Sequence, residues 1–383
     1  MDLKLFFDSI SPDIVKNIDN NSCFLQAISV NIDNMPKWKK AHIALLGVGE
    51  YRGGQAATHN NAADLIRQHL YKLHRQSHIY NVVDIGNLRI GESLEQTYLR
   101  LSEVVAMLLK NNVLPIIIGG SHDLTLAQYT AYQDTEKLIE VLNIDALLDM
   151  DSQSTQAANS HTHSLFLHEP NYLFGYTHLA YQSYLNDYQQ VNLLKNFNYE
   201  ALSIGEMRND FTEVEPYIRQ ADMLSFDTAA LRQTQGQVPF NAFPFGLSGE
   251  EACQIAWYAG CNDKLSSLGI YGYYPQNDNN QQTAFTIATM IWYFIEGFYS
   301  RKNELPIANS YHTKYAVPFE KTGETITFYK SNLSEKWWLE VPLTAVQQPY
   351  ESHKIVPCSY KDYQEALQGH LPDRWIKASK KGI

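Results

Sequence analysis

Short apolar runs rich in β-branched residues recur along the chain up to residue 271, and helical stretches separate them. Seven of these runs predict buried strands, at 42–47, 80–85, 114–118, 139–144, 201–204, 223–226 and 267–271. The stretches that predict helices include 62–74, 93–111, 123–132, 249–259 and 284–300. Strands that alternate with helices are typical of repeated βαβ units, so the pattern predicts an α/β fold with a mostly parallel sheet.

The pattern changes near residue 301. Beyond it, the segments 324–331 and 335–342 predict a β-hairpin, and Ser359 with Asp362 three residues later is a partial capping-box signal for a short helix. We therefore expect three parts: an N-terminal segment (1–39), an α/β domain (40–301) and a C-terminal appendage with a hairpin and a short helix (302–383).

Composition excludes several classes of protein. The hydrophobic share of 44% and the charged share of 19% are those of a folded globular chain. The 30 Lys and Arg against 41 Asp and Glu give a net charge of -11, which disfavours nucleic acid and anionic membranes as partners. The cysteines form no CxxC pair, so neither a zinc knuckle nor a disulfide framework is indicated. With no signal peptide and no apolar run of membrane-spanning length, we expect a cytoplasmic protein.

Candidate chemistry lies just after three predicted strands. IIIGGSHD leaves His122 at a strand end, LNIDALLDMD carries Asp145 and Asp149, and Asp227 ends the run MLSFD. Ligands of α/β sheets bind outside the carboxyl ends of the strands, so these side chains are expected to converge. One His and three Asp form a site for a hard divalent cation such as Mn²⁺ or Mg²⁺. The alternative is an empty site in which the same groups are joined by hydrogen bonds.

These motifs resemble those of the ureohydrolase superfamily of arginase, agmatinase and formimidoylglutamase. The family motifs GGxHx, DAHxD and SxDxDxxDP correspond to GGSHD, DALLD and SFDTAALRQ; LLGVGEYRGG, SIGEMR and GLSGEEACQIAWYAG are also similar. The resemblance covers roughly residues 40–300. It implies an arginase-like three-layer α/β/α arrangement around a mostly parallel sheet of about eight strands, here with a C-terminal α+β appendage.

The resemblance also implies a ligand set. By position, His122, Asp145, Asp149 and Asp227 correspond to the family's complete first-metal shell. Leu147 stands in place of the motif-two His and Ala229 in place of the second motif-three Asp, so both losses fall on the second metal. We therefore expect one Mn²⁺ or other divalent cation, or no metal at all.

Further departures concern the substrate. The family places an acid for the guanidinium three residues before a Pro, and here Gly272 precedes Pro275 by that spacing. Arginase or agmatinase activity is therefore not expected. In NSHTHSLFLH, His161 and His163 lie where the family has a loop histidine that shuttles protons. The alternative for both is a solvated polar loop.

Two hypotheses follow. In the first, which the departures favour, the chain is a degenerate, catalytically impaired member (a pseudoenzyme) that binds a ligand or a partner. Trp337 and Trp338 place one aromatic on each face of the hairpin, so one could be offered to a partner, but core packing of at least one of them is the favoured interpretation. In the other, it is an active single-metal hydrolase of an amidine or formimidoyl C–N bond. The sequence names neither the small molecule nor the protein partner, and a homo-oligomer is compatible with it. Nucleotide binding at 47–54 is disfavoured because Arg52 takes the third glycine position.

Overall fold

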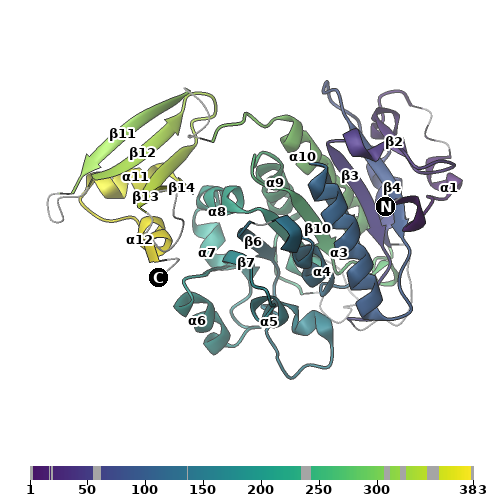
Figure 1. Cartoon of the computed structure of the whole chain (residues 1–383), viewed down its shortest axis with the longest axis horizontal. Helices are drawn as coiled ribbons and strands as arrows, with labels where there is room; N and C mark the ends of the chain where they lie inside the picture. Colours follow the sequence, from purple (N-terminus) through teal and green to yellow (C-terminus); the bar gives the residue numbers. More distant parts are fainter. Residues whose placement is uncertain are drawn as a thin grey trace.

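Figure 1 shows the computed structural model of the chain, in which a mixed α/β body carries a smaller sheet at one side. The structure describes residues 3–16, 18, 20–54, 62–135, 137–233, 243–305, 311–319, 325–342 and 353–380. Within those ranges, no helix combines the length and the apolar character needed to cross a bilayer.

The described residues form a central sheet of ten strands. Its order is β1 (Phe7–Asp8), β4 (Val82–Leu88), β3 (Ile43–Val48), β5 (Leu114–Ile118), β10 (Ser267–Tyr271), β9 (Met223–Asp227), β6 (Ile139–Ile144), β7 (Leu173–Tyr181) and β8 (Glu200–Ser203), and β2 (Ile28–Val30) also pairs with β4. All pairs are parallel except that of β1 with β4. The mostly parallel α/β sheet that the sequence predicts is therefore confirmed.

Three strands do not follow the apolar pattern. β7 was not predicted because Thr177 and His178 interrupt its run, yet both side chains are buried. β1 and β2 come from the N-terminal segment and extend the sheet beyond β4. They are two and three residues long, too short to show a period.

Helices cover both faces of the central sheet. One hydrophobic core includes residues of α2 (Ala62–Leu70), α9 (Gly249–Gly260) and α10 (Gln282–Tyr299), and a second includes residues of α3 (Leu94–Lys110) and α4 (Leu124–Thr130). Alternate residues of β3 enter the two cores: Ile43 and Leu45 the first, Ala44 and Leu46 the second. Strands buried on both faces are apolar at most positions, which is why they read as nearly continuous apolar runs. Smaller elements complete this body: α1 (Pro12–Val15), α5 (His161–Phe166), α6 (Tyr188–Asn196), α7 (Ile204–Asn209) and α8 (Glu215–Gln220).

A second sheet lies at the C-terminal end of the chain. Its antiparallel strands are β11 (His312–Pro318), β12 (Thr325–Ser331), β13 (Trp337–Pro342) and β14 (His353–Cys358), followed by α11 (Tyr360–Leu367) and α12 (Asp373–Lys380). We call β11–β14 with α11 and α12 the C-terminal unit, and the described residues up to Arg301 the central unit. The predicted hairpin corresponds to β12 and β13, and the predicted cap of Ser359 with Asp362 opens α11. β11, β14 and α12 were not predicted.

The C-terminal unit has a hydrophobic core of its own and contacts α8 of the central unit (Figure 1). Arg219 of α8 donates hydrogen bonds to the carbonyl oxygens of Trp337 and Cys358, and its guanidinium lies 4.3 Å from the centre of the Trp338 ring. Trp337 and Trp338 are 7% and 3% exposed. Core packing, the favoured interpretation of these tryptophans, is therefore confirmed, because the unit's own core and Arg219 cover them and neither is exposed.

Candidate metal centre

The candidate ligands lie at the carboxyl ends of strands in the middle of the sheet. Asp145 follows β6 directly, Asp227 ends β9, and His122 comes four residues after β5. Gly119 and Gly120 make the turn before His122 with φ of +94° and +84°. A Cβ on Gly120 would lie 2.1 Å from Leu124 Cδ1, so only glycine fits there.

The three carboxylates converge on one nitrogen. His122 Nδ1 lies 2.9 Å from Asp145 Oδ2, 3.2 Å from Asp227 Oδ2 and 3.3 Å from Asp149 Oδ2. The His122 and Asp145 side chains are almost fully buried, and those of Asp149 and Asp227 are 8% and 11% exposed. The structure therefore brings together all four residues that the sequence singles out as first-metal ligands.

The other nitrogen of His122 meets neutral groups. Its Nε2 lies 3.1 Å from Asn143 Oδ1 and 3.1 Å from Ser225 Oγ, which in turn lies 2.6 Å from Thr125 Oγ1. Donation from Nε2–H to the Asn143 amide oxygen leaves the lone pair of Nδ1 pointing at the carboxylates. Three carboxylates and a lone pair repel one another unless a positive charge lies among them, so the site calls for either a cation or a proton.

The pKa values of these residues reflect the need for a positive charge in the cluster. Burial alone lowers the pKa of His122, but Asp227, Asp145 and Asp149 outweigh it and raise that pKa well above its usual value. Burial, reinforced by the charge of Asp149, raises the pKa of Asp145 to about 7. Burial and the charge of Asp145 raise the pKa of Asp227 to about 7 as well. Without a metal, the cluster therefore holds protons near neutral pH.

The spacing also fits a metal shell. Ligand atoms at right angles on a cation with bonds of about 2.1 Å lie about 3 Å apart, which is the separation between His122 Nδ1 and its three oxygens. Neighbouring groups orient the imidazole through Nε2, as is usual for a metal-binding histidine. His122, Asp145 and Asp227, whose ligand atoms all lie within 4.8 Å of one another, thus fit one divalent cation, with Asp149 on the neighbouring side of His122.

The resemblance implies second-metal ligands at positions 147 and 229. Leu147 and Ala229 carry apolar side chains, and their backbone N–H groups donate to Asp145 Oδ1 and Asp227 Oδ1 at 3.2 and 2.6 Å. In the described part of the chain, both clusters of ligand-type residues contain His122: His122, Asp145 and Asp227, and His122, Asp149 and His161. Among the described residues, the second-metal position therefore lacks its own His and Asp and keeps only the two carboxylates that the resemblance implies as bridging ligands, Asp145 and Asp227.

The two loop histidines have different surroundings. His161 is 2% exposed, with its ring centre 4.2 Å from that of His122 and its Nδ1 2.8 Å from the Ala158 carbonyl oxygen. Burial, with the charge of His122, lowers its pKa well below the usual value. The solvated-loop alternative is therefore wrong for His161. His163 is half-buried on α5, and the structure does not bring it into either ligand cluster.

A small cavity of about 70 Å³ opens beside the cluster, and its wall includes Leu147, Ala229, Gly272, Tyr274 and Asp278. Gly272 has φ of +74°, and a Cβ there would lie 2.3 Å from Asp227 Oδ1. An acidic side chain at position 272 would therefore collide with Asp227 in this backbone conformation. Asp278 Oδ2 accepts hydrogen bonds from the Tyr273 hydroxyl and from Ala284 N–H, at 3.1 and 3.0 Å.

Sequence reasoning missed the groups that hold the ligands in place. Asn143 and Ser225 support His122, and Nε2 of His178 on β7 lies 3.1 Å from the Asp145 carbonyl oxygen. Asn143 and Ser225 are polar residues inside mostly apolar strands, a signal that the sequence contains. His178 belongs to the strand that was not predicted.

Comparison with known proteins identifies a matching family model and relatives of similar sequence. The model of the Arginase family matches residues 41–296. A formimidoylglutamase from Staphylococcus haemolyticus is 23% identical over 279 residues, which are 69% of this chain and 89% of that protein. One from a Geobacillus species is 23% identical over 269 residues, 67% of this chain and 82% of that protein.

The fold of this chain resembles those of several solved structures. A variant of Trypanosoma cruzi formiminoglutamase, solved with Mn²⁺, matches with a TM-score of 0.64 at 17% identity, covering 73% of this chain and 99% of that one. The agmatine ureohydrolase of Thermoplasma volcanium matches with a TM-score of 0.57 at 17% identity, covering 69% and 93%. The arginase-like fold is therefore confirmed.

Proposed function

Since this chain belongs to the Arginase family, we propose that it is a formimidoylglutamase-like hydrolase that holds one divalent cation and cleaves the C–N bond of a formimidoyl group. His122, Asp145, Asp149 and Asp227 are the proposed ligands. The observation that carries the proposal is the convergence of three carboxylate oxygens on His122 Nδ1, within 3.3 Å. The relatives named formimidoylglutamase support the substrate class, and the T. cruzi structure solved with Mn²⁺ supports that metal.

The proposed reaction adds water across the formimidoyl C–N bond. The water oxygen bonds to the formimidoyl carbon, the bond from that carbon to the amine nitrogen breaks, and a proton passes to the departing amine. With formimidoylglutamate, the products are formamide and glutamate. A divalent cation in the site supplies Lewis acidity and a water of lowered pKa.

Hydrogen bonds from neighbouring residues hold the proposed ligands in place. Asn143 and Ser225 fix the imidazole of His122, and the N–H groups of Leu147 and Ala229 hold the carboxylates of Asp145 and Asp227. Gly272 stands where the family resemblance implies an acid for a guanidinium, and Asp278 of the same wall already accepts hydrogen bonds from Tyr273 and Ala284. Removing one member of a buried charge pair costs about 2–5 kcal/mol, which disfavours arginine and agmatine as substrates.

Two measurements on the purified protein test the proposal. After loading with Mn²⁺, we expect about one ion per chain by elemental analysis, and glutamate release from N-formimidoylglutamate. The Asp145→Ala variant should lose both, whereas His163→Ala, outside the ligand clusters, should retain both. Mn²⁺ should also raise the melting temperature, because a cation at a hundredfold excess over Kd stabilises by about 2.7 kcal/mol. Two ions per chain, or full activity in Asp145→Ala, would contradict the proposal.

A second candidate is a member that binds its ligand without hydrolysing it. The specific observation is that Leu147 and Ala229 occupy the second-metal ligand positions, so the clamp of a two-metal site is absent. Calorimetry separates the two candidates. Binding of N-formimidoylglutamate to the Mn²⁺-loaded protein without glutamate release would favour this second candidate over the first.

A further inference from the structure

The cavity beside the metal cluster has acids but no basic side chains on its wall. Among the described residues, the charged or ionisable groups that line it are Asp145, Asp149, Asp227, Asp278 and His122, with no lysine or arginine. Carboxylates that bind a metal are deprotonated, so one divalent cation leaves the wall with a net charge of about -2. A cavity lined by one sign of charge attracts substrates of the opposite sign and repels those of the same sign.

Basic residues that are close to the wall in the sequence do not change this charge. Arg52 pairs with Glu50 and does not line the cavity. Arg232 is exposed and does not line it either. The stretches 55–61 and 234–242, which lie outside the described residues, contain no lysine or arginine in their sequence. The negative charge of the wall therefore remains after its neighbours are counted.

Asp278 is the acid of this wall that the metal ligand clusters do not include. Its Oδ2 accepts hydrogen bonds from the Tyr273 hydroxyl and from Ala284 N–H, at 3.1 and 3.0 Å, and its Oδ1 accepts none from a described residue. A carboxylate accepts up to about four hydrogen bonds. Asp278 therefore keeps a free oxygen and a full negative charge for a cationic group of a substrate.

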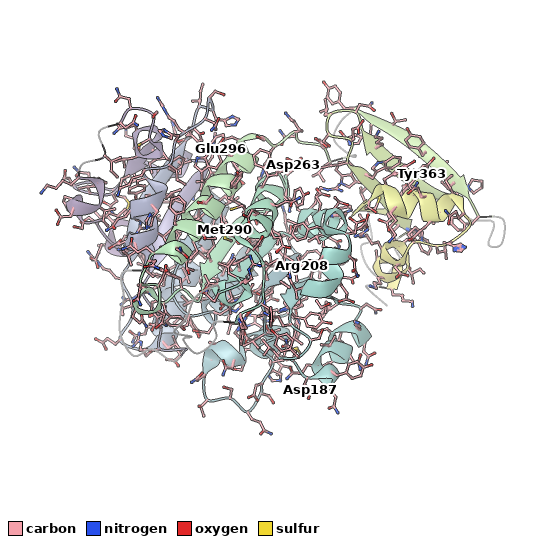
Figure 2. All side chains as sticks on the ribbon, turned by 180° about the vertical axis from the view of Figure 1, so that it is seen from behind. Asp187, Arg208, Asp263, Met290, Glu296 and Tyr363 are labelled. Atoms are coloured by element: carbon pink, nitrogen blue, oxygen red, sulfur yellow. The ribbon has the colours of Figure 1, made fainter. Side chains whose placement is uncertain are left out.

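The wall on either side of Asp278 is neutral. Asn277 and Thr283 line the cavity there, and Thr283 lies in the first turn of α10. Figure 2 shows α10 from behind, with Met290 and Glu296 labelled on it. A substrate carboxylate at this part of the wall would face Asp278 without a cationic partner, and a juxtaposition of like charges discriminates against such a ligand.

We propose that the substrate is the formimidoyl derivative of a cationic amine, and that Asp278 pairs with the ammonium group of its amine part. The inference rests on the proposed hydrolase activity and specifies its substrate. The formimidoyl group lies at the metal, and the ammonium group receives a charge-assisted hydrogen bond from Asp278. N-formimidoylglutamate presents two carboxylates to the same wall and is therefore hydrolysed more slowly.

The test compares three amidines on the full chain loaded with Mn²⁺: N-(4-aminobutyl)formamidine, N-butylformamidine and N-formimidoylglutamate. They share the formimidoyl group and differ in the charge of the amine part. We expect kcat/KM to be at least tenfold higher for the aminobutyl compound than for N-formimidoylglutamate, with the butyl compound between them. If none of the three is hydrolysed, the proposed function is contradicted, and calorimetry of the same compounds tests the inference by the order of their affinities.

Two variants change the charge of the wall. Asp278→Asn keeps an oxygen for Ala284 N–H and removes the charge, so it should lower the preference for the aminobutyl over the butyl compound about tenfold. Asn277→Lys adds a cation on the exposed part of the wall and should raise kcat/KM for N-formimidoylglutamate, relative to the aminobutyl compound, about tenfold. Asn209→Lys makes the same change on an exposed residue of α7 outside the wall and should leave both ratios unchanged.

The inference is overturned if N-formimidoylglutamate is the best substrate or the tightest ligand of the unmodified protein. An unchanged preference in Asp278→Asn would overturn it as well. Should Asp278→Asn fail to fold, an unchanged ratio in Asn277→Lys has the same meaning, because that variant leaves the hydrogen bonds of Asp278 intact.

Discussion

At His122, the two ring nitrogens meet different chemistry, and this difference accounts for the properties of the site. Nε2 is held by neutral oxygens of Asn143 and Ser225, and Nδ1 faces only carboxylates. A metal ion and a proton are the two ways to balance such a cluster. Leu147 and Ala229 line the cavity beside this cluster. They carry no charge and therefore require no second cation.

Restoring the two lost ligands should restore the second ion. We expect Leu147→His together with Ala229→Asp to raise the Mn²⁺ content from about one to about two ions per chain, because the added carboxylate is balanced by the incoming cation. Elemental analysis measures this. The control, Leu147→Gln with Ala229→Asn, adds side chains of similar size that bind metal poorly. A count that stays at one in the His and Asp variant would contradict the prediction.

Gly272 should resist substitution. We expect Gly272→Ala to lower the free energy of unfolding by about 2 kcal/mol or more, because a left-handed backbone disfavours a Cβ and this one meets Asp227 Oδ1 at 2.3 Å. Denaturant unfolding measures it. Gly205→Ala in α7 is the control, since its Cβ would make only an ordinary contact at 3.9 Å. Equal effects of the two substitutions would show that the backbone at 272 adapts. Adding a carboxylate at 272 is therefore no simple route to a guanidinium site.

At the scale of elements, the neighbouring carboxyl ends of β5, β9 and β6 bring together residues from distant parts of the sequence. α8 has the corresponding role for the C-terminal unit. Its Arg219 pairs with Glu215 on the same helix and reaches two carbonyl oxygens of the second sheet. Arg219 of this short helix is thus one of the side chains that join the two units, beside the ion pairs of Lys336, Arg374 and Lys377.

Removing that side chain should loosen the C-terminal unit. We expect Arg219→Ala to cost about 3 kcal/mol, because buried carbonyls lose their donor and Trp338 loses its stacking partner. Proteolysis of the C-terminal unit should accelerate in parallel. The control is Arg208→Ala, which removes the ion pair of Arg208 with Glu251. Because the Arg208 side chain is 43% exposed, this change should cost under about 1 kcal/mol. Similar costs for both variants would argue against the anchoring role of Arg219.

For the whole molecule, each unit has its own hydrophobic core, and hydrogen bonds and ion pairs are prominent in the contact between them. Such an interface costs less to open than a continuous apolar core. We therefore propose that the chain divides into two separately packed units near residue 301.

Truncation tests that division. A chain ending at Arg301 should remain folded and bind Mn²⁺, with a lower melting temperature because α8 loses the partners of Arg219. Circular dichroism and metal analysis of the truncated protein measure these outcomes, with the full chain as the control. Complete loss of soluble protein would show that the C-terminal unit completes the fold of the central one.

The apolar pattern alone determined most of the central sheet, because strands buried on both faces are apolar at most positions. It also placed His122, Asp145, Asp149 and Asp227 at one edge, since the carboxyl ends of parallel strands meet there. The missing second-metal ligands, at positions 147 and 229, follow only from the resemblance to the family motifs. Each is a single position within a motif of fixed spacing.

Only the tertiary structure decided the rest. The burial of Thr177 and His178 in β7 depends on neighbours that come from other strands, so no local pattern reports it. The same holds for His161, whose polar surroundings in the sequence suit a solvated loop but which packs against His122. A cavity between the units exists only where Trp257 and Trp338, from distant parts of the sequence, face a common space. Contacts of this kind are set by packing in three dimensions, which the order of residues does not display.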